Sequence, residues 1–196
     1  MKDKSRRIAD LIYEGAMLKS TPRTGFAFLG SGTESVAEHS FGTAFIGLIL
    51  AMLAGADTGK TVRLCLLHDL HEAATGDLNY VNHRYDSCDA RAALMDACAG
   101  TGLEKDFLSA WEEFEARSTQ EAVLANDADQ LDMICSLRRE LAKGNRFAAE
   151  WLTTAVQRLR SPIAQTLCES IMKTDPSSWW YDQVDKSWWI NRNRDS

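Results

Sequence analysis

A histidine and an aspartate stand side by side in the most apolar part of this chain, where neither is expected without a partner. His68 and Asp69 directly follow Cys65-Leu66-Leu67. Burying a carboxylate costs free energy unless a cation or hydrogen bonds compensate its charge. Imidazole with carboxylate is the ligand set of a divalent metal such as Mn, Fe, Co, Ni or Zn. A buried histidine hydrogen-bonded to its neighbour explains the pair equally well, so this segment leaves both interpretations open.

Two other segments place a residue of the same chemistry near an apolar face. His39 lies in the first turn and a half of a predicted helix that begins near Ser35. Asp129 lies in a helical stretch whose core-facing side is marked by Leu131 and Ile134. Three helices can thus supply two imidazoles and two carboxylates, with water filling the remaining positions of an octahedral ion. The predicted ligands are His39, His68, Asp69 and Asp129.

Two further carboxylates follow the histidine–aspartate pair. Glu72 comes one helical turn after His68 and therefore shares its face. A carboxylate there can orient or deprotonate a bound water. Asp77, just past the end of the predicted helix, can protonate a leaving oxygen or grip a sugar hydroxyl. Without a metal, the better interpretations are a surface residue for Glu72 and a turn residue for Asp77.

Helices must position these residues, because helical periodicity dominates the chain. The sequence has only three prolines and no convincing alternation of polar and apolar residues. Ser35, with Glu38 three residues later, has the pattern of a helix-capping box. Residues 20–34 are expected to form a loop. The predicted helices span residues 4–19, 35–54, 60–74, 84–100, 103–116, 118–143, 147–160 and 162–173. The sequence therefore predicts an all-α fold, a single compact helical bundle over residues 1–196.

The order and spacing of these residues resemble a known superfamily. His39, then His68-Asp69, then Asp129 is similar to the H…HD…D arrangement of the HD-domain phosphohydrolases. The segment HDLHEAATGD, residues 68–77, resembles the HD-x-x-E-x-x-x-G-D segment of the 5′-deoxynucleotidase (YfbR-like) branch. ESVAEHS, residues 34–40, resembles its E-S-V-x-[DE]-H segment, and residues 111–115 and 127–130 match later blocks. The resemblance covers about residues 18–145, leaving C-terminal helices and a Trp-rich tail over 147–196.

The resemblance implies an HD-domain fold and a function. It implies a 5′-nucleotidase that removes phosphate from (deoxy)nucleoside 5′-monophosphates with one divalent metal ion: Mn, Co, Fe, Ni, Zn or Mg. It assigns metal ligation to the four residues above, catalytic help to Glu72, and a water or substrate role to Asp77. Arg23 matches the arginine that faces the nucleotide. Bacterial members place a tryptophan after that arginine to help read the sugar, whereas this chain has Thr24 there.

Two other functions are compatible with parts of the pattern. One is a non-catalytic, metal-stabilised module that senses nucleotides, but the presence of both Glu72 and Asp77 opposes it. The other is a di-iron HD oxygenase, which needs additional histidines after the HD doublet to hold a second iron. No histidine follows His83 in this chain, which disfavours that class.

Composition limits the partners and the location. The formal net charge of -6 argues against a nucleic acid polymer as partner, although it permits a small phosphorylated substrate held by a metal and local cations. The N-terminus is charged where a signal peptide needs an apolar core. The longest apolar run, residues 45–54, is too short to span a bilayer. We therefore expect a cytoplasmic protein with no membrane partner.

Several residues are expected to have structural roles. His71 is interpreted as a surface or supporting histidine, His83 as loop surface, and Asp127 as a solvated or supporting carboxylate. The five cysteines are interpreted as small buried hydrophobes in a reducing compartment. The aromatic tail is expected to fasten the C-terminal segment onto the core or onto a second subunit. With the apolar excess over several helices and the family resemblance, the tail predicts a homodimer. The tail tryptophans are Trp179, Trp180, Trp188 and Trp189.

Overall fold

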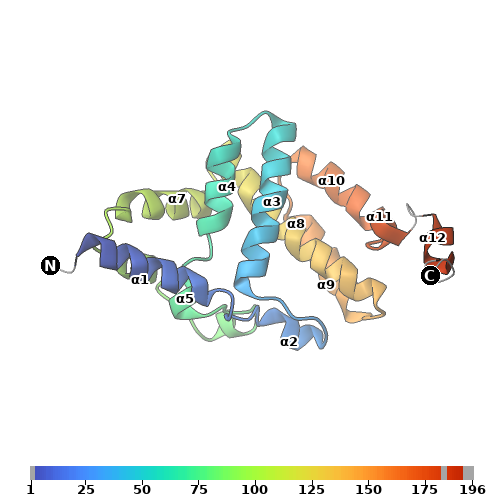
Figure 1. Ribbon diagram of the computed structural model, residues 1–196, viewed down its shortest axis with the longest axis horizontal. Coiled ribbons are helices and arrows are strands. Elements are labelled where there is room, and N and C mark those ends of the chain that lie inside the picture. The colour runs from blue at the N-terminus through green and yellow to red at the C-terminus, as the bar shows by residue number, and fades with distance from the viewer. Residues whose placement is uncertain (1–2, 182–184, 192–196) are drawn as a thin grey trace.

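The protein is built from helices joined by short turns (Figure 1). The computed structural model describes residues 3–181 and 185–191. In that part of the chain the only β-type pairing is an isolated bridge between Pro22 and Ser35, which confirms the predicted all-α class. The helices are α1 (Lys4–Met17), α2 (Gly25–Leu29), α3 (Val36–Ala54), α4 (Thr58–Leu67), α5 (Glu72–Thr75), α6 (Ala90–Cys98), α7 (Glu104–Ala116), α8 (Gln120–Ala142), α9 (Phe147–Ala155), α10 (Pro162–Lys173), α11 (Ser178–Tyr181) and α12 (Lys186–Asn191).

Helix α3 runs through the middle of the molecule and packs against α4 and α8 (Figure 1). These three helices contribute much of the main apolar core, which includes the fully buried Leu50, Leu64 and Leu131. The approach of α3 to α4 requires Gly47, because a Cβ there would come within 2.6 Å of the Cys65 sulfur. The helices that carry the predicted ligands are therefore the ones held together most closely.

A second apolar cluster fixes the chain that follows α4. Leu70 packs there with Leu11 of α1, Leu94 of α6 and Val36 at the start of α3. The backbone of Ala37 also donates a hydrogen bond to the Leu18 carbonyl at 3.1 Å. Because Leu70 is anchored in this way, the residues just before it have a defined place relative to α3.

The prediction of one continuous helix over residues 60–74 is wrong in one respect, because the structure has two helices there with turns between them. Helix α4 ends at Leu67, the segment 68–71 forms tight turns, and α5 begins at Glu72. The turns are closed by i→i−3 hydrogen bonds, from Leu70 N to Leu67 O at 3.2 Å and from Glu72 N to Asp69 O at 3.0 Å. The change of direction places His68 and Asp69 at a corner rather than on a straight helix.

Other boundaries also differ from the sequence prediction. The predicted loop 20–34 contains the short helix α2. The helix expected from residue 84 begins only at Ala90, because Asp89 caps it by accepting a hydrogen bond from the Ala92 N–H at 2.9 Å. The helix expected over 147–160 ends at Ala155 and continues as a short 3-10 turn. The 4–19, 35–54, 103–116, 118–143 and 162–173 helices are confirmed with small changes at their ends.

Helix α3 has the composition of a membrane-spanning helix but serves as a core helix of this fold. Among the described helices it alone is long and apolar enough to cross a membrane, with a mean hydropathy of 1.6. Its contacts with α4 and α8 bury one face. The opposite face exposes a row of large apolar side chains that begins at Phe41.

The two tryptophans of α11 are not packed on the core, which leaves the second of the two expectations, packing on a second subunit, as a prediction. Helices α11 and α12 lie at the end of the molecule opposite α1 (Figure 1). Trp179 is 75% exposed and Trp180 42% exposed. The side chains of Trp188 and Trp189 lie outside the described part of the structure. All five cysteines are free; Cys65, Cys98 and Cys168 are buried as predicted, whereas Cys88 is exposed.

Candidate metal centre

His39 is brought to the centre of the molecule by the fixed start of α3. The Ser35 hydroxyl accepts a hydrogen bond from the Glu38 N–H at 3.2 Å, and the Glu38 carboxylate accepts one from the Ser35 N–H at 2.7 Å. This is the capping box that the sequence predicts. His39 follows directly and is completely buried.

His68 and Asp69 enter the same region from the end of α4. The His68 N–H still donates to the Leu64 carbonyl at 3.1 Å, so His68 completes the last turn of that helix. Its ring packs on Phe114, with the ring centroids 4.9 Å apart. Asp69 is the first residue of the turn that follows, and its side chain is 14% exposed. The corner after α4 therefore presents an imidazole and a carboxylate together.

Helix α8 supplies carboxylates to both sides of the His39 ring. Asp129 Oδ1 lies 3.1 Å from His39 Nε2. Asp132, one turn later on the same face of α8, has its Oδ2 2.8 Å from His39 Nδ1. His39 is thus held between two aspartates of one helix.

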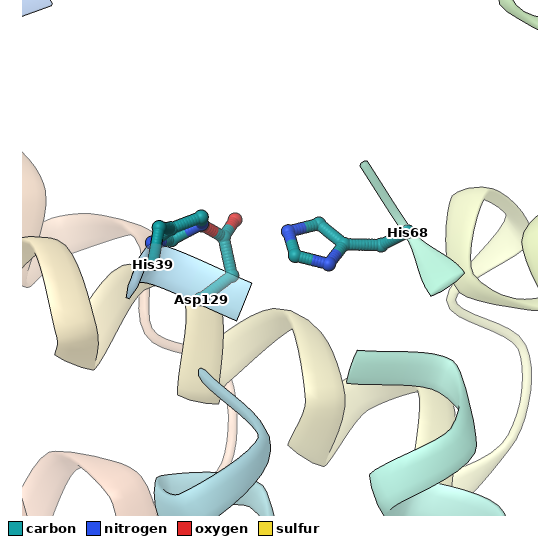
Figure 2. A group of neighbouring side chains, drawn as sticks. All are labelled: His39, His68 and Asp129. Carbon is teal, nitrogen blue, oxygen red and sulfur yellow. The ribbon is translucent and has the colours of Figure 1, made fainter. Parts of the chain in front are cut away.

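The predicted ligands converge from three elements that are far apart in the sequence. Figure 2 shows the His68 ring pointing toward His39 and the Asp129 carboxylate, with one ligand atom of each lying within 4.8 Å of the others. Asp69 Oδ2 lies 3.1 Å from His68 Nε2 and 3.7 Å from His39 Nε2. The cluster is therefore a group able to hold a metal ion.

Hydrogen bonds on the far side of each ring leave the inward nitrogens available. The Cys65 carbonyl can only accept, so His68 Nδ1, 2.7 Å away, carries the proton. The Asp132 carboxylate likewise accepts from His39 Nδ1. Both Nε2 atoms are buried and have no hydrogen bond of good geometry among the described residues. Buried polar atoms without such bonds are uncommon in proteins, and two of them beside carboxylates suit a cation.

The electrostatics of the cluster favour bound positive charge. Burial opposes the charged form of His39, but the adjacent Asp129 and Asp132 outweigh burial and raise its pKa to about 10. Burial of Asp69 and Asp129 favours their neutral forms, yet the neighbouring histidines lower the pKa of both carboxyls. Protons on the imidazoles thus balance two buried carboxylates, and a divalent ion would balance the same charge.

Glu72 is a half-buried residue close enough to this cluster to be affected by the charge of Asp69. Its Oε2 makes no hydrogen bond within the described residues. Burial, followed by the nearby Asp69 and Asp77, raises its pKa to about 9. Perturbed carboxyls of this kind are typical of groups that transfer protons.

Hydrogen bonds between two loops bring Arg23 and Asp77 to the cluster. Arg23 Nη1 lies 3.4 Å from Asp69 Oδ2, and the Arg23 side chain is 19% exposed. The next residue, Thr24, donates from its backbone N–H to Asp77 Oδ2 at 2.6 Å and from its hydroxyl to the Asp77 carbonyl at 2.9 Å. Asn79 donates to the same hydroxyl at 3.0 Å. Asp77 therefore holds the segment that carries Arg23 against the site.

Three residues given structural roles from the sequence have defined positions. Asp127 is 1% exposed rather than solvated, and its carboxylate accepts from the N–H groups of Arg160 and Ser161, both at 2.8 Å. His71 is half-buried and packs edge-on against Trp111, with the ring centroids 6.3 Å apart. His83 is exposed, as predicted for loop surface.

Sequence reasoning missed Asp132. The residue follows Asp129 by three positions, which puts both on one helical face. That spacing was a usable signal, but an aspartate in a long helix is more often solvated.

The fold agrees with comparisons to known proteins. The chain matches the HD domain family over residues 15–171 and belongs to that family. The family resemblance expected from the motifs is therefore confirmed.

Individual relatives make the similarity more specific. The chain is 30% identical to the 5′-deoxynucleotidase HDDC2 of zebrafish (Danio rerio), over 60% of this chain and 61% of that protein. It is also 30% identical to the human protein of that name, over 66% of each chain. The chain therefore spans about three fifths to two thirds of the length of these relatives.

A solved structure shares the fold over nearly its whole length. A conserved hypothetical protein from Pyrococcus furiosus superposes with a TM-score of 0.72 at 28% sequence identity. The match covers 85% of this chain and 99% of that chain.

Proposed function

We propose that this protein is a metal-dependent phosphohydrolase that removes the phosphate from nucleoside 5′-monophosphates, acting as a 5′-nucleotidase. The observation that carries the proposal is the pair of buried Nε2 atoms on His39 and His68, each beside an aspartate and without a hydrogen bond of good geometry. Membership of the HD domain family and the names of the relatives support the same reaction.

We assign the metal to His39, His68, Asp69 and Asp129. A divalent ion bound by these residues supplies a positive charge beside the phosphoryl group and lowers the pKa of the attacking water. The negative charge of Asp69 helps to raise the pKa of Glu72, but Glu72 is not one of the residues whose ligand atoms cluster together. Without a metal, the raised pKa of Glu72 keeps it protonated at neutral pH. The positive charge of a bound divalent ion would lower that pKa, so that the ionised Glu72 could accept the proton that the attacking water loses.

The remaining polar residues bind the substrate. Arg23, whose half-buried guanidinium lies beside Asp69, can hold phosphate oxygens through paired hydrogen bonds. Asp77 uses Oδ2 to hold Thr24, and we assign Oδ1 to the leaving 5′-oxygen or to a sugar hydroxyl. In the overall step, water forms a new P–O bond, the ester P–O bond breaks, and the nucleoside oxygen receives a proton.

A phosphate-release screen tests the proposal. Metal-stripped protein is reloaded separately with Mn, Co, Fe, Ni, Zn or Mg and assayed with every ribo- and deoxyribonucleoside 5′-monophosphate. We expect release of inorganic phosphate from at least one nucleotide, dependent on the added metal. The paired sugars also test whether Thr24 permits a ribose. Nucleotide binding by metal-loaded protein without phosphate release would instead support a nucleotide-sensing module.

We also propose that the protein is a homodimer joined through the exposed face of α3. Four large apolar side chains follow one another along this face at helical spacing: Phe41, Phe45, Leu48 and Met52, with Leu53 beside them. After the buried His39 the helix contains no charged residue, so charge does not oppose the pairing of its exposed face with a second copy. With exposed fractions of 36–72%, these five side chains present roughly 600 Å² if a fully exposed side chain of this size presents roughly 200 Å².

That area suits a second copy of the chain as the occupant. A contiguous apolar patch of this size is at the upper limit for a monomer. A stable interface buries about 800 Å² on each partner, so the α3 row and its rim would provide most of it. Two copies of one helix related by a twofold axis place each row against itself, as a self-complementary interface requires.

A further inference from the structure

Asp132 contacts the outer side of the His39 ring, away from the proposed ligand atoms. Its Oδ2 lies 2.8 Å from His39 Nδ1, and the His39 ring is completely buried. No other hydrogen bond to this nitrogen occurs among the described residues. The orientation of the ring is therefore determined at two points: the α3 backbone and the Asp132 carboxylate.

The Asp132 carboxylate lies so close to α3 that the helix has a glycine, Gly42, at the point of approach. A Cβ on Gly42 would lie 2.0 Å from Asp132 Oδ1 and 2.7 Å from its carboxyl carbon. Gly42 is in the interior of α3, where glycine is unfavourable by about 1 kcal/mol relative to alanine. Glycine at this position therefore has a packing reason, which is to admit Asp132.

A second carboxylate, that of Glu34, lies close to the contact between His39 and Asp132. Glu34 offers a second carboxylate within 4.8 Å of the His39 and Asp132 ligand atoms. Glu34 Oε1 accepts a hydrogen bond from the Ser136 hydroxyl at 3.0 Å, and Arg139 Nη2 lies 3.8 Å from the same oxygen. Among the described residues it is Asp132, and not Glu34, whose carboxylate accepts the hydrogen bond from His39 Nδ1.

We propose that Asp132 is a positioning residue that fixes His39 with its proton on Nδ1 and its Nε2 lone pair directed at the metal. The Cys65 carbonyl orients His68 in the same way, by accepting a hydrogen bond from His68 Nδ1 at 2.7 Å. The two imidazoles therefore differ in their outer partners, a charged carboxylate for His39 and a neutral carbonyl for His68. A carboxylate partner makes the imidazole a more basic ligand, so Asp132 strengthens metal binding by His39.

The inference rests on the proposed metal site, and its test begins with the wild-type protein. Zn²⁺ is a suitable probe because it is diamagnetic, so binding can be measured by calorimetry and the histidine nitrogens by ¹⁵N NMR. The chain has four histidines, which keeps the spectrum simple. If wild-type protein binds no Zn²⁺ or other divalent metal, the proposed function fails and not only the role of Asp132.

The decisive variant is Asp132→Asn, which keeps the size of the side chain and removes its charge. We expect Zn²⁺ affinity to fall about 10–100-fold, in line with losses of outer-shell partners. In the Zn²⁺-loaded protein the His39 Nδ1–H signal should shift or broaden, while the His68 signals should stay unchanged as an internal reference. A merely structural role for Asp132 would not produce this selective change.

The matched control is Glu140→Gln. Glu140 is also a buried carboxylate of α8, but its partners are Ser31 and Lys143, outside the metal cluster. We expect it to retain wild-type Zn²⁺ affinity. The inference is overturned if Asp132→Asn binds Zn²⁺ as tightly as wild type with an unchanged His39 spectrum, or if Glu140→Gln loses as much affinity.

Discussion

At the scale of single residues, the candidate metal centre contains carboxylates with two different roles. Some would bind the ion, and one would transfer a proton. Asp69 Oδ2 lies within 3.1 Å of one imidazole nitrogen and 3.7 Å of the other. Glu72 has no such contact in the described structure, and one of its oxygens is buried without a partner. The two carboxylates are three positions apart in the chain but have different surroundings.

This difference predicts opposite results for two alanine variants. Asp69→Ala removes a ligand and a negative charge, so it should abolish metal binding. Glu72→Ala leaves the ligand atoms in place and should retain the metal, while turnover falls by about 10²–10⁴-fold through loss of the general base. Metal content by elemental analysis, measured beside nucleotidase rates, separates the two effects.

Each outcome identifies a role. Loss of the metal from Glu72→Ala would make Glu72 a ligand. Near-normal turnover in that variant would mean that another group, first of all Asp77, activates the water. Asp77→Ala then becomes informative in its own right, since it also releases Thr24 and the loop that carries Arg23.

At the scale of elements, the two aspartates of α8 that are two positions apart serve different purposes. Asp129 faces His39, whereas Asp127 faces away and binds the backbone at the start of α10. The Arg160 and Ser161 N–H groups precede that helix, so Asp127 fastens the segment just before α10 to α8. This contact connects the C-terminal helices to the helix that carries the site.

Asp127→Asn should therefore weaken the fold without removing the metal. The amide keeps one acceptor oxygen, and its NH₂ group then faces a backbone donor. We expect the free energy of unfolding to fall by about 1–3 kcal/mol, the usual cost of an unsatisfied buried polar group. Denaturant unfolding measures the loss, and metal content should remain at the wild-type level. Asp129→Asn is the control, because it should lose the metal instead; loss of metal from Asp127→Asn would contradict this division.

The sequence predicted elements well where local chemistry decides their ends. Ser35 and Glu38 form the expected capping box, and Pro162 begins α10 after the Ser161 cap. The break after Leu67 was not predictable in the same way, because residues 67–74 contain no glycine or proline. Anchoring of Leu70 in the second apolar cluster accompanies that break, and this tertiary contact has no local signature.

The candidate site was predictable to a similar extent. His39, His68, Asp69 and Asp129 were found because ligand-type residues on apolar helices are unusual, and they do converge. Their assignment as ligands stays a prediction. Asp132 was missed because its partner, His39, is 93 positions away and a helical aspartate carries no sign of burial. The contact between Thr24 and Asp77 likewise joins loops whose distance no local pattern reveals.

At the scale of the whole molecule, large apolar side chains are exposed at several places in the described part of a single chain. They include the row on α3 and the aromatic segment of α11 with Trp179 and Tyr181. A surface hollow of about 420 Å³ lies at the first turns of α3, lined by Lys19, Ala37 and Phe41. Such a hollow beside a row of large side chains can receive side chains of a second copy.

The α3 row therefore predicts how the dimer would be broken. Phe45 lies in the middle of the row, stacks on Phe41 with the ring centroids 6.4 Å apart, and is 57% exposed in the single chain. Phe45→Glu places two charges close to the twofold axis, where their repulsion and desolvation oppose association. The protomer should still fold, since the side chain can extend into water. Sedimentation at micromolar concentration should change from twice the chain mass of 21.8 kDa to the monomer.

Tyr85→Glu is the matched control, because Tyr85 is 82% exposed and lies in the segment before α6 rather than on α3. It should leave the dimer intact. Metal content should be unchanged in both variants, because every proposed ligand comes from one protomer. A wild-type protein that sediments only as a monomer would refute the dimer itself. A Phe45→Glu protein that stays dimeric would place the interface elsewhere, and the aromatic segment of α11 would then be the next surface to change.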